Sequence, residues 1–430
     1  MELNEEVKKE LNRCLNCPAS PCKLACPFNN EIPKVISLAK ENKIMEAYDL
    51  LKEKTCLSSI CGIVCPHAKQ CEGSCTRNKI DGPVKIGLIE SSIANLVKEN
   101  CNDLNNLYDT TISSEELEKN SSKNIAIVGS GPSGITCAYF LARKGYKVTI
   151  FEKHDTYGGL LTHGIPEFRL DREIIKKEYD NIINKLGIKI FFNKELEKDI
   201  FLTELLCDYD AVYLAMGANI PQKMGIEGED FENVYQGNSL LENNNHPDYT
   251  DKIVAVSGGG DVAIDTVRTI IRKGAKKVYL IYRRARENMP CQDKEVEEAI
   301  EEGVEIKFQK NIVKILDEND NKVHKLVLID TELVEENGKI VAKNIEGTEH
   351  ELDVDVLVMA IGSKADKELN SRLDLDLNEK NYIKVNENHR TSAVTVFAGG
   401  LVANSNNTVA FAGRDGRDAA EKIIEYLNNL

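Results

Sequence analysis

The stretch Lys123–Lys153, KNIAIVGSGPSGITCAYFLARKGYKVTIFEK, decides the fold of this chain. A short apolar strand is expected at 125–128, followed by a glycine turn at 129–134, a helical pattern, and a second strand at 148–151. In a dinucleotide site the first glycine makes the bend, the second lets a pyrophosphate approach the backbone, and the third lets helix and strand pack closely. The sequence therefore predicts a Rossmann-like nucleotide site in which the Glu152 carboxylate accepts the ribose hydroxyls.

Length and charge limit the classes of function. With 430 residues the chain has room for two or three domains. A formal net charge of -15 and a pI near 5.2 argue against a nucleic-acid partner, which needs a basic face. No apolar run has the length of a membrane span, and the N-terminal sequence MELNEEVKKE is unlike a signal peptide. We therefore expect a cytoplasmic protein with no nucleic-acid and no membrane partner.

The cysteines are concentrated near the N-terminus. Nine of the 13 lie between Cys14 and Cys75, in CLNCPASPCKLACP and CLSSICGIVCPHAKQCEGSCTR, with a helical stretch expected at 32–54 between them. In a reducing compartment such clustering favours metal ligation over disulfides. Zinc sites favour paired CxxC knuckles, whereas only one CxxC occurs here. The pattern predicts two [4Fe–4S] clusters in a helical domain at 1–120, with structural zinc or free buried cysteines as alternatives, and a polar linker at 102–122.

The opening motif occurs a second time at Asp251–Arg284, DKIVAVSGGGDVAIDTVRTIIRKGAKKVYLIYRR. Where the first copy has Glu152, this copy has Tyr282, Arg283 and Arg284. A carboxylate suits a free 2′-hydroxyl and repels a 2′-phosphate, whereas arginines form forked, charge-assisted contacts with that phosphate. The first copy therefore predicts an FAD site and the second an NADPH site. NADH binding and a solvated strand end remain the alternatives for the two arginines.

The order of these patterns predicts an α/β protein with two Rossmann-like domains, the second inserted in the first. Buried strands ending in glycine are expected at 208–218 and 353–363, and a strand at 394–400 precedes a last helix at 408–427. The N-terminus of that helix would point at the flavin ring. The expected division is a helical iron–sulfur domain at 1–120, an FAD-binding domain at 121–225 and 358–430, and an NAD(P)H-binding domain at 226–357.

Several long motifs then carry a family resemblance over nearly the whole chain. They are the cysteine pattern, GPVKIGLIE (Gly82–Glu90), GSGPSG, GGLLTHGIPEFRL, GGGDVAID, YRR and the FAGG ending. The chain resembles the family that contains the small (beta) subunit of bacterial glutamate synthase and the flavin/NADPH half of dihydropyrimidine dehydrogenase. The same family includes the small subunit of bacterial NAD-dependent dihydropyrimidine dehydrogenase and the large subunit of a bifurcating ferredoxin:NADP oxidoreductase.

The resemblance implies how the cluster ligands divide. One cluster would be held by Cys14, Cys17, Cys22 and Cys75, and the other by Cys26, Cys65 and Cys71. In dihydropyrimidine dehydrogenase a glutamine supplies the eighth ligand, and Glu90 stands at the matching position here. Glu90 could instead be an ordinary exposed helix residue, and Cys61 is a nearby thiol alternative.

The nucleotide sites follow from the motifs and the resemblance together. The candidate FAD residues are Gly129, Ser130, Gly131, Pro132, Ser133, Gly134, Glu152, Lys153, Gly159, Leu160, Arg169, Gly217, Gly400, Thr408 and Val409. The candidate NAD(P)H residues are Gly258, Gly259, Gly260, Asp261, Val262, Arg283, Arg284, Arg286, Ala360, Ile361 and Gly362, with Ser363 nearby. One position departs from the family, because Leu401 stands where an Asp usually contacts the flavin, so we expect FAD binding to be weaker or arranged differently.

The predicted cofactors define a reaction type. Nicotinamide carriers move two electrons as hydride and iron–sulfur clusters move one, and a flavin converts between them, so no catalytic side chain is predicted. A disulfide reductase would need a cysteine pair beside the flavin, whereas Cys137, Cys207 and Cys291 are single. We expect an NAD(P)H-oxidising electron-input subunit of a hetero-oligomer, which feeds a larger catalytic subunit or a ferredoxin-like acceptor.

Glutamate synthase is the leading assignment for that partner. A dihydropyrimidine dehydrogenase and a ferredoxin:NADP oxidoreductase are the alternatives within the family. A redox-sensing or scaffold subunit with structural cofactors is the alternative of another class.

Overall fold

The computed structural model of the chain describes residues 2–100, 112–218, 220–243, 245–336, 338–404, 406 and 408–429. The chain forms two compact units. The first unit comprises Met1–Thr162, Glu167–Ala218 and Ala365–Leu430, and the second comprises His163–Pro166 and Asn219–Lys364. The second unit is inserted into the first, and the expected α/β class with two Rossmann-like folds and a helical N-terminal region is confirmed.

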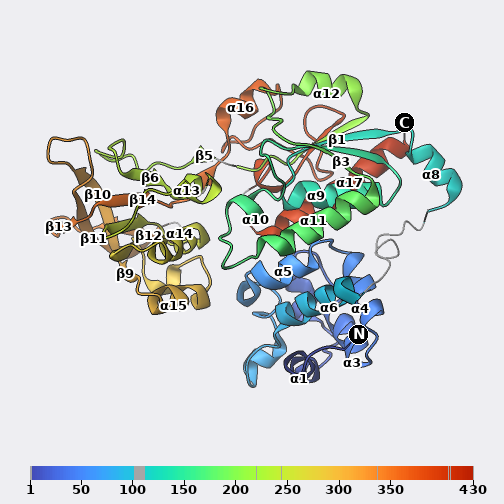
Figure 1. Ribbon diagram of the computed structural model, residues 1–430, viewed down its shortest axis with the longest axis horizontal. Helices are drawn as coiled ribbons and strands as arrows, with labels where there is room; N and C mark the ends of the chain where they lie inside the picture. The colour runs from blue at the N-terminus through green and yellow to red at the C-terminus, as the bar shows by residue number, and fades with distance from the viewer. Residues whose placement is uncertain are drawn as a thin grey trace. The chain divides into compact units, whose positions relative to one another are not determined.

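The N-terminal part of the first unit consists of short helices joined by cysteine-bearing loops, drawn in blue and, at its end, in turquoise in Figure 1. The helices are α1 (Glu5–Arg13), α2 (Pro21–Ala25), α3 (Ile32–Lys40), α4 (Ile44–Lys52), α5 (Ser58–Val64), η1 (His67–Lys69), η2 (Thr76–Lys79), α6 (Ile86–Asn100) and α8 (Ser114–Asn120). Helix α5 packs against α6 and also contacts α11 (Arg172–Leu186). The helical region is therefore joined to the nucleotide fold of the same unit.

The rest of the first unit is a parallel five-stranded sheet with the order β16-β4-β1-β2-β3. The strands are β1 (Asn124–Val128), β2 (Lys147–Phe151), β3 (Lys189–Phe191), β4 (Ala211–Leu214) and β16 (Val396–Ala398). The helices are α9 (Pro132–Ala142), α10 (Leu160–His163), α11, α12 (Leu202–Asp208), α16 (Lys367–Arg372), η4 (Gly400–Val402) and α17 (Val409–Asn428). Helices α9 and α17 lie side by side (Figure 1), and Gly416 permits this because a side chain there would overlap the Ser133 backbone.

The second unit repeats this topology in a parallel sheet with the order β6-β14-β7-β8-β9. Its strands are β6 (Val234–Gln236), β7 (Ile253–Ser257), β8 (Lys277–Tyr282), β9 (Glu305–Phe308) and β14 (Val356–Met359), and its helices are α13 (Gly237–Asn243), α14 (Asp261–Arg272), η3 (Arg286–Asn288) and α15 (Asp293–Glu301). Before β14 the chain forms an antiparallel sheet of β10 (Lys310–Leu316), β11 (Lys325–Glu336), β12 (Lys339–Asn344) and β13 (His350–Asp353). A separate two-stranded sheet pairs β5 (Ile220–Pro221) with β15 (Ser363–Lys364). Strand β7 pairs with β8 and β14 as β1 pairs with β2 and β4.

Two expected segments differ from the structure. The helical stretch expected at 32–54 consists of two helices, because Asn42 has a left-handed φ of 58° that ends α3 before α4 begins. The polar segment expected to be a linker at 102–122 lies outside the described residues up to 111. Its later part forms α8, whose N-cap Ser113 accepts a hydrogen bond from the Glu116 N–H at 3.1 Å.

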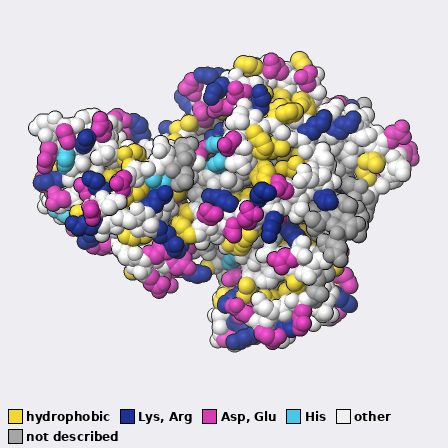
Figure 2. All heavy atoms as spheres, in the orientation of Figure 1, with side chains coloured by type: hydrophobic (Ala, Val, Ile, Leu, Met, Phe, Trp, Pro, Cys, Tyr) yellow, Lys and Arg dark blue, Asp and Glu magenta, His cyan; other side chains and the backbone are white. Residues whose placement is uncertain are grey.

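The surface is mixed in charge. Lys and Arg side chains are interspersed with Asp and Glu over the face shown in Figure 2. In the part of the chain that the structure describes, no helix has the length and apolar character needed to cross a membrane.

Candidate functional site

The first glycine turn has the geometry of a phosphate-binding turn. Gly129 has a φ of 101°, and a Cβ there would lie 2.6 Å from the Ala215 carbonyl oxygen. A Cβ on Gly134 would overlap the Gly129 carbonyl, whereas one on Gly131 would have its nearest neighbour, Gly159 Cα, 3.9 Å away. Gly131 is also the N-cap of α9 and provides no side-chain cap. The turn therefore offers an open backbone cradle at the start of α9, where the first N–H groups of a helix have no partner within the helix, and this fits a pyrophosphate.

Glu152 is held rigidly at the end of β2. It is 4% exposed, and its Oε2 accepts hydrogen bonds from the Ser130 N–H at 2.8 Å and the Ser130 hydroxyl at 2.6 Å. Its Oε1 accepts one from the His154 N–H at 3.0 Å. The Gly158 N–H donates to Ser130 Oγ at 3.2 Å, so the loop after β2 is tied to the glycine turn. Oε1 retains a lone pair, which fits a ribose hydroxyl.

The other candidate FAD residues follow the carboxyl ends of strands in the same sheet. After β2 come Lys153, Gly159, Leu160 and Arg169, and after β4 comes Gly217. After β16 come Gly400, Thr408 and Val409, and the first residue of α9 is Pro132. Ligands of open α/β sheets bind outside these strand ends. Ser133 differs, because its Oγ lies 2.7 Å from the Tyr213 hydroxyl in the interior and serves the packing of the fold.

The turn that carries Leu401 is supported from inside by a carboxylate that the sequence did not single out. Asp415 on α17 is 2% exposed. Its Oδ2 accepts hydrogen bonds from the Gly400 N–H at 3.1 Å and from Asn404 Nδ2 at 2.6 Å. Arg414 Nη2 lies 3.0 Å from Asp415 Oδ1. The turn after β16 is thus fixed although Leu401 brings no polar group to it.

The second glycine turn repeats the geometry of the first. Gly258 has a φ of 152°, and a side chain there would overlap the carbonyl of Ala360, the residue that follows β14. Gly260 is the N-cap of α14, and a Cβ on it would have its nearest neighbour 3.8 Å away. Gly259 lies against the Tyr282 ring, whose hydroxyl donates to a backbone carbonyl at 2.6 Å. Tyr282 therefore supports the turn, a role that the sequence analysis missed although YRR was its key motif.

The arginines after β8 differ in their surroundings. Arg283 is exposed, whereas Arg284 is half-buried and its Nε is buried without a hydrogen-bond partner. Arg286 Nη2 lies 3.6 Å from Glu297 Oε1 and 4.0 Å from Asp293 Oδ1. An unsatisfied buried N–H of a guanidinium is costly, and an anion would remove that cost. Arg283 and Arg284 therefore fit a 2′-phosphate, while Arg286 is held by carboxylates of its own unit.

The remaining NAD(P)H candidates lie around the same strand ends. Asp261 and Val262 open α14, and Ala360, Ile361 and Gly362 follow β14. The structure thus brings the predicted residues of the second copy to the carboxyl edge of β7, β8 and β14.

Four of the candidate metal ligands lie at the ends of short helices. Cys14, Cys26 and Cys65 are the C-caps of α1, α2 and α5, and Cys75 is the N-cap of η2. All four have extended backbone, and a proline directly after Cys26 and after Cys65 prevents the helix from continuing. Thiols from separate helices can therefore meet in the loops between them.

The first predicted ligand set lines one cavity. Cys14, Cys17, Cys22 and Cys75 share this cavity with apolar side chains from α3 and from residues 84–86. Burial raises the pKa of the Cys22 thiol to about 11, and the neighbouring Cys14 and Cys75 add to the rise. The thiolate forms are costly here without a compensating cation, which fits a metal-bound state.

The second predicted set is more deeply buried. Cys26 and Cys71 each lie close enough to Glu90 and Cys65 for charge interactions, which with burial raise both thiol pKa values. Glu90 is 9% exposed, and burial raises its pKa to about 8. The alternative that Glu90 is an ordinary exposed helix residue is therefore wrong. Cys61 hydrogen-bonds to Cys65 and also lies near Glu90 and Cys26, so both candidates for the eighth ligand reach this set.

Among the described residues, no group of three or more His, Cys, Asp or Glu side chains is arranged to hold a metal ion. A [4Fe–4S] cluster does not require convergence on a single ion, because each of its four ligands binds a different iron atom. The two sets fit such clusters by the identity and grouping of their donors.

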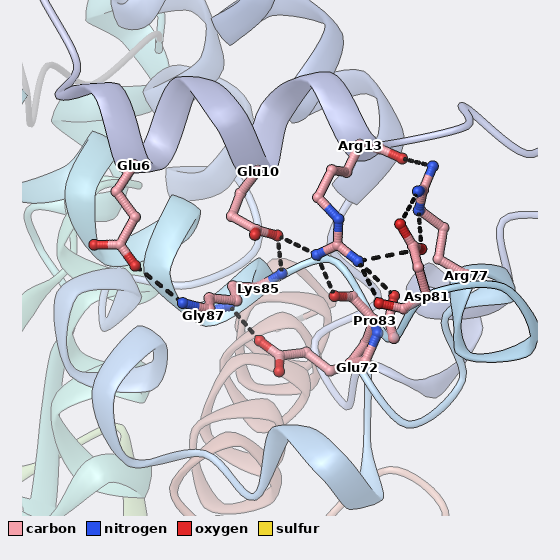
Figure 3. A network of polar contacts seen from close by, with 10 residues as sticks. Glu6, Glu10, Arg13, Glu72, Arg77, Asp81, Pro83, Lys85 and Gly87 are labelled. Atoms are coloured by element: carbon pink, nitrogen blue, oxygen red, sulfur yellow. Dashed lines mark hydrogen bonds and ion pairs between the residues drawn. The ribbon is translucent and has the colours of Figure 1, made fainter.

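A polar network that the sequence analysis missed fixes the first set (Figure 3). Arg13 Nη2 donates to the Asp81 carbonyl at 3.1 Å, Arg77 Nε donates to Asp81 Oδ1 at 2.8 Å, and Arg77 Nη1 donates to the Arg13 carbonyl at 3.1 Å. Arg13 directly precedes Cys14, and Arg77 follows Cys75 by two residues. The network thus joins Cys14 and Cys75, which belong to one ligand set but are far apart in the sequence. The arginines beside these two cysteines were the only feature of the sequence that could have indicated the network.

A second missed residue connects the cysteine segment to the nucleotide fold. Gln70 is 7% exposed and precedes Cys71. Its Nε2 donates to Thr408 Oγ1 at 3.5 Å, at the N-cap of α17. The second ligand set therefore lies near the helix N-terminus that was expected to face the flavin.

Known protein families match both the cysteine-rich N-terminal part of the chain and the part with the two nucleotide folds. The family described as pyridine nucleotide-disulphide oxidoreductase matches residues 123–416, and that described as dihydropyrimidine dehydrogenase domain II, 4Fe-4S cluster, matches residues 2–102. The chain is 36% identical to the glutamate synthase [NADPH] small chain of Escherichia coli, over 98% of this chain and 92% of that protein. It is 35% identical to the NADP(+)-dependent formate dehydrogenase subunit beta of Moorella thermoacetica, over 95% of this chain and 60% of that protein. The structure of Mycobacterium tuberculosis FprA in complex with NADPH shares the fold, with a TM-score of 0.64 and 20% identity over 71% of this chain and 85% of that chain.

Proposed function

Because the chain belongs to the family of FAD- and iron–sulfur-containing NAD(P)H oxidoreductases that includes the glutamate synthase small subunits, we propose that it is the electron-input subunit of a glutamate synthase. NADPH would bind in the second unit and FAD in the first. Electrons would then pass through two [4Fe–4S] clusters to a larger partner subunit, which would form glutamate from glutamine and 2-oxoglutarate. The expected domains, at 1–120, at 121–225 with 358–430, and at 226–357, would each hold one of these cofactor types.

The hydrogen bond between Gln70 and Thr408 is the observation that supports the proposed electron route from the flavin to the clusters. It supports a position for the second ligand set next to the flavin end of α17. The cysteines of the first set are all partly exposed, whereas Cys65 and Cys71 of the second are buried. We infer that electrons reach the buried set first and leave from the partly exposed one.

When bound, FAD would supply the conversion between hydride and single-electron transfer. The residues of the chain orient and hold the groups. Glu152 would fix the adenosine ribose, the open turn at Gly131 and the start of α9 would hold the pyrophosphate, and the N-terminus of α17 would favour negative charge on the flavin ring. Arg283 and Arg284 would hold the 2′-phosphate of NADPH.

Glu90 is the proposed eighth ligand. It lies near both Cys26 and Cys71, whereas Cys61 hydrogen-bonds to Cys65 and lies near Cys26 and Glu90 itself. A buried carboxylate without a compensating cation would be costly, and an iron atom would supply that compensation.

Anaerobic co-purification from the native cell tests the proposal. A large subunit in equal amount, together with NADPH oxidation that depends on both glutamine and 2-oxoglutarate, is the expected result. A pyrimidine-reducing or ferredoxin-binding partner would refute the assignment to glutamate synthase. It would not contradict the proposed oxidation of NADPH by the flavin of this chain. A chain whose flavin does not react with NADPH would refute the input reaction as well.

A further inference from the structure

A buried asparagine lies between two proposed ligands of the second cluster. Asn30 is 1% exposed, and its Nδ2 donates a hydrogen bond to Glu90 Oε1 at 3.3 Å. The backbone N–H of the same residue donates to the sulfur of Cys26. Asn30 therefore contacts the proposed carboxylate ligand through its side chain and a proposed thiolate ligand through its backbone.

The backbone turn that carries Asn30 is held in place by its own hydrogen bonds and by α17. Cys26 is the C-cap of α2, the Asn29 N–H donates to the Cys26 carbonyl at 2.8 Å, and the Phe28 N–H donates to the Cys26 sulfur. Phe28 is 1% exposed, and its carbonyl accepts a hydrogen bond from Arg417 Nη1 on α17 at 2.9 Å. Because this turn is fixed, the side-chain amide of Asn30 starts from a fixed position beside the ligands.

Packing alone does not explain an amide at this position. The Asn30 Oδ1 atom is buried and has no hydrogen-bond partner among the described residues. A buried carbonyl oxygen without a partner is costly, so an apolar side chain of similar size would suit a purely structural role better. A carboxylate that binds iron is ionised and only accepts hydrogen bonds, so it suits the NH2 half of the amide. The side chain of Asn30 therefore fits a role toward Glu90.

We propose that Asn30 is a positioning residue for the second [4Fe–4S] cluster, and that its amide holds Glu90 Oε1 so that Oε2 is the atom that binds iron. The inference rests on the proposed function, because it takes Glu90 as the eighth ligand. Hydrogen bonds from outer residues commonly orient the ligands of a metal. Hydrogen bonds to the ligands of a cluster also stabilise its more negative, reduced form. Asn30 would thus fix the geometry and raise the reduction potential of this one cluster.

A redox titration of the full-length holoprotein, followed by EPR spectroscopy, tests the proposal. Dithionite and mediators set the potential, so neither NADPH nor a partner chain is needed. The second cluster is identified as the one whose signal changes in Glu90→Ala, and an unaltered signal in that variant would overturn the proposal. In Asn30→Leu the ratio of reduced to oxidised second cluster at a fixed potential should fall at least about tenfold, which is a midpoint about 59 mV lower for one electron. An unchanged ratio would overturn the proposal.

The same substitution in a Glu90→Cys background separates positioning from folding. A thiolate at position 90 has no carboxylate oxygen for the amide to hold, so Asn30→Leu should then change the ratio less than about twofold. An equally large change in both backgrounds would overturn the proposal, because the amide would then act on the cluster independently of Glu90.

A matched control removes another buried amide from the same unit. Asn370 is also 1% exposed, and its Nδ2 donates to the Asn381 carbonyl at 2.9 Å. Asn370→Leu should leave the potentials of both clusters unchanged, and a shift of the second cluster as large as that in Asn30→Leu would overturn the proposal. If Asn30→Leu does not assemble with iron, Asn30→Ser, whose side chain is shorter and lacks the amide, provides the same comparison.

The reaction of the flavin with NADPH is recorded in parallel on the wild type. A flavin that does not bleach would refute the proposed input reaction, whereas the cluster potentials, which are measured without NADPH, would still decide the role of Asn30.

Discussion

Replacement of Arg283 and Arg284 by alanine should separate NADPH from NADH. The exposed Arg283 should contribute about 0.5–1 kcal/mol to the binding of a phosphate. Arg284 should contribute more, about 1.5–3 kcal/mol, because its buried Nε has no hydrogen-bond partner within the protein. Together the losses are about 2–4 kcal/mol, which corresponds to a decrease of roughly 30- to 1,000-fold in kcat/KM for NADPH.

The assay is steady-state oxidation of each nucleotide with a one-electron dye as acceptor. NADH lacks the 2′-phosphate, so its kcat/KM should change by less than about threefold, a difference below 1 kcal/mol. The matched control is Arg286→Ala, whose guanidinium lies near Asp293 and Glu297 and should matter little. An equal loss for both nucleotides would refute the phosphate role. A large loss for NADPH alone in Arg286→Ala would mean that Arg286 also binds the phosphate.

Four further changes test other parts of the account. Arg13→Met should lower the iron content by about half, because Arg13 directly precedes Cys14 and joins it to Asp81 and Arg77, which lie close to Cys75 of the same ligand set; unchanged iron would contradict this. Glu90→Ala should alter the electron paramagnetic resonance (EPR) signal of one cluster while Glu90→Cys restores it, and an unaltered Ala variant would exclude Glu90 as a ligand. Lys98→Met leaves the 2% exposed Glu178 carboxylate unpaired and should lower the free energy of unfolding by about 3–5 kcal/mol in a denaturant titration, with a smaller loss when Glu178→Gln is added. Burial lowers the pKa of His246 to about 4 from 6.5. Between these pH values the folded second unit therefore binds fewer protons than the unfolded chain and loses stability as pH falls. The hydrogen-exchange protection factors of β7, corrected for the pH dependence of the intrinsic rate, should fall there in the wild type and less in His246→Asn.

The nucleotide folds were predictable because each is encoded locally. The strand, glycine turn, helix and second strand of the repeat occupy continuous stretches, and Gly129 and Gly258 both have the positive φ that a sharp turn requires. The parallel order of the strands then follows from the crossover helices. The break at Asn42 was missed, because asparagine is tolerated within a helical pattern and only its left-handed backbone shows where the helix ends.

The contacts between distant segments were not predictable in the same way. Gln70 and Thr408 are separated by most of the chain, and a hydrogen bond between two such polar residues leaves no periodic signal. The support that Asp415 gives to the turn at Gly400 is of the same kind. The sequence showed which residue types were present near the cofactor sites, whereas folding decided which of them meet.

The most direct test of the central claim is an anaerobic titration of the isolated holoprotein with NADPH, followed by visible absorption and EPR spectroscopy. We expect the flavin absorption to bleach and EPR signals of two separate reduced clusters then to appear without any partner present. Bleaching followed by the signal of a single cluster would contradict the two ligand sets. A flavin that stays oxidised in excess NADPH would contradict the account as a whole.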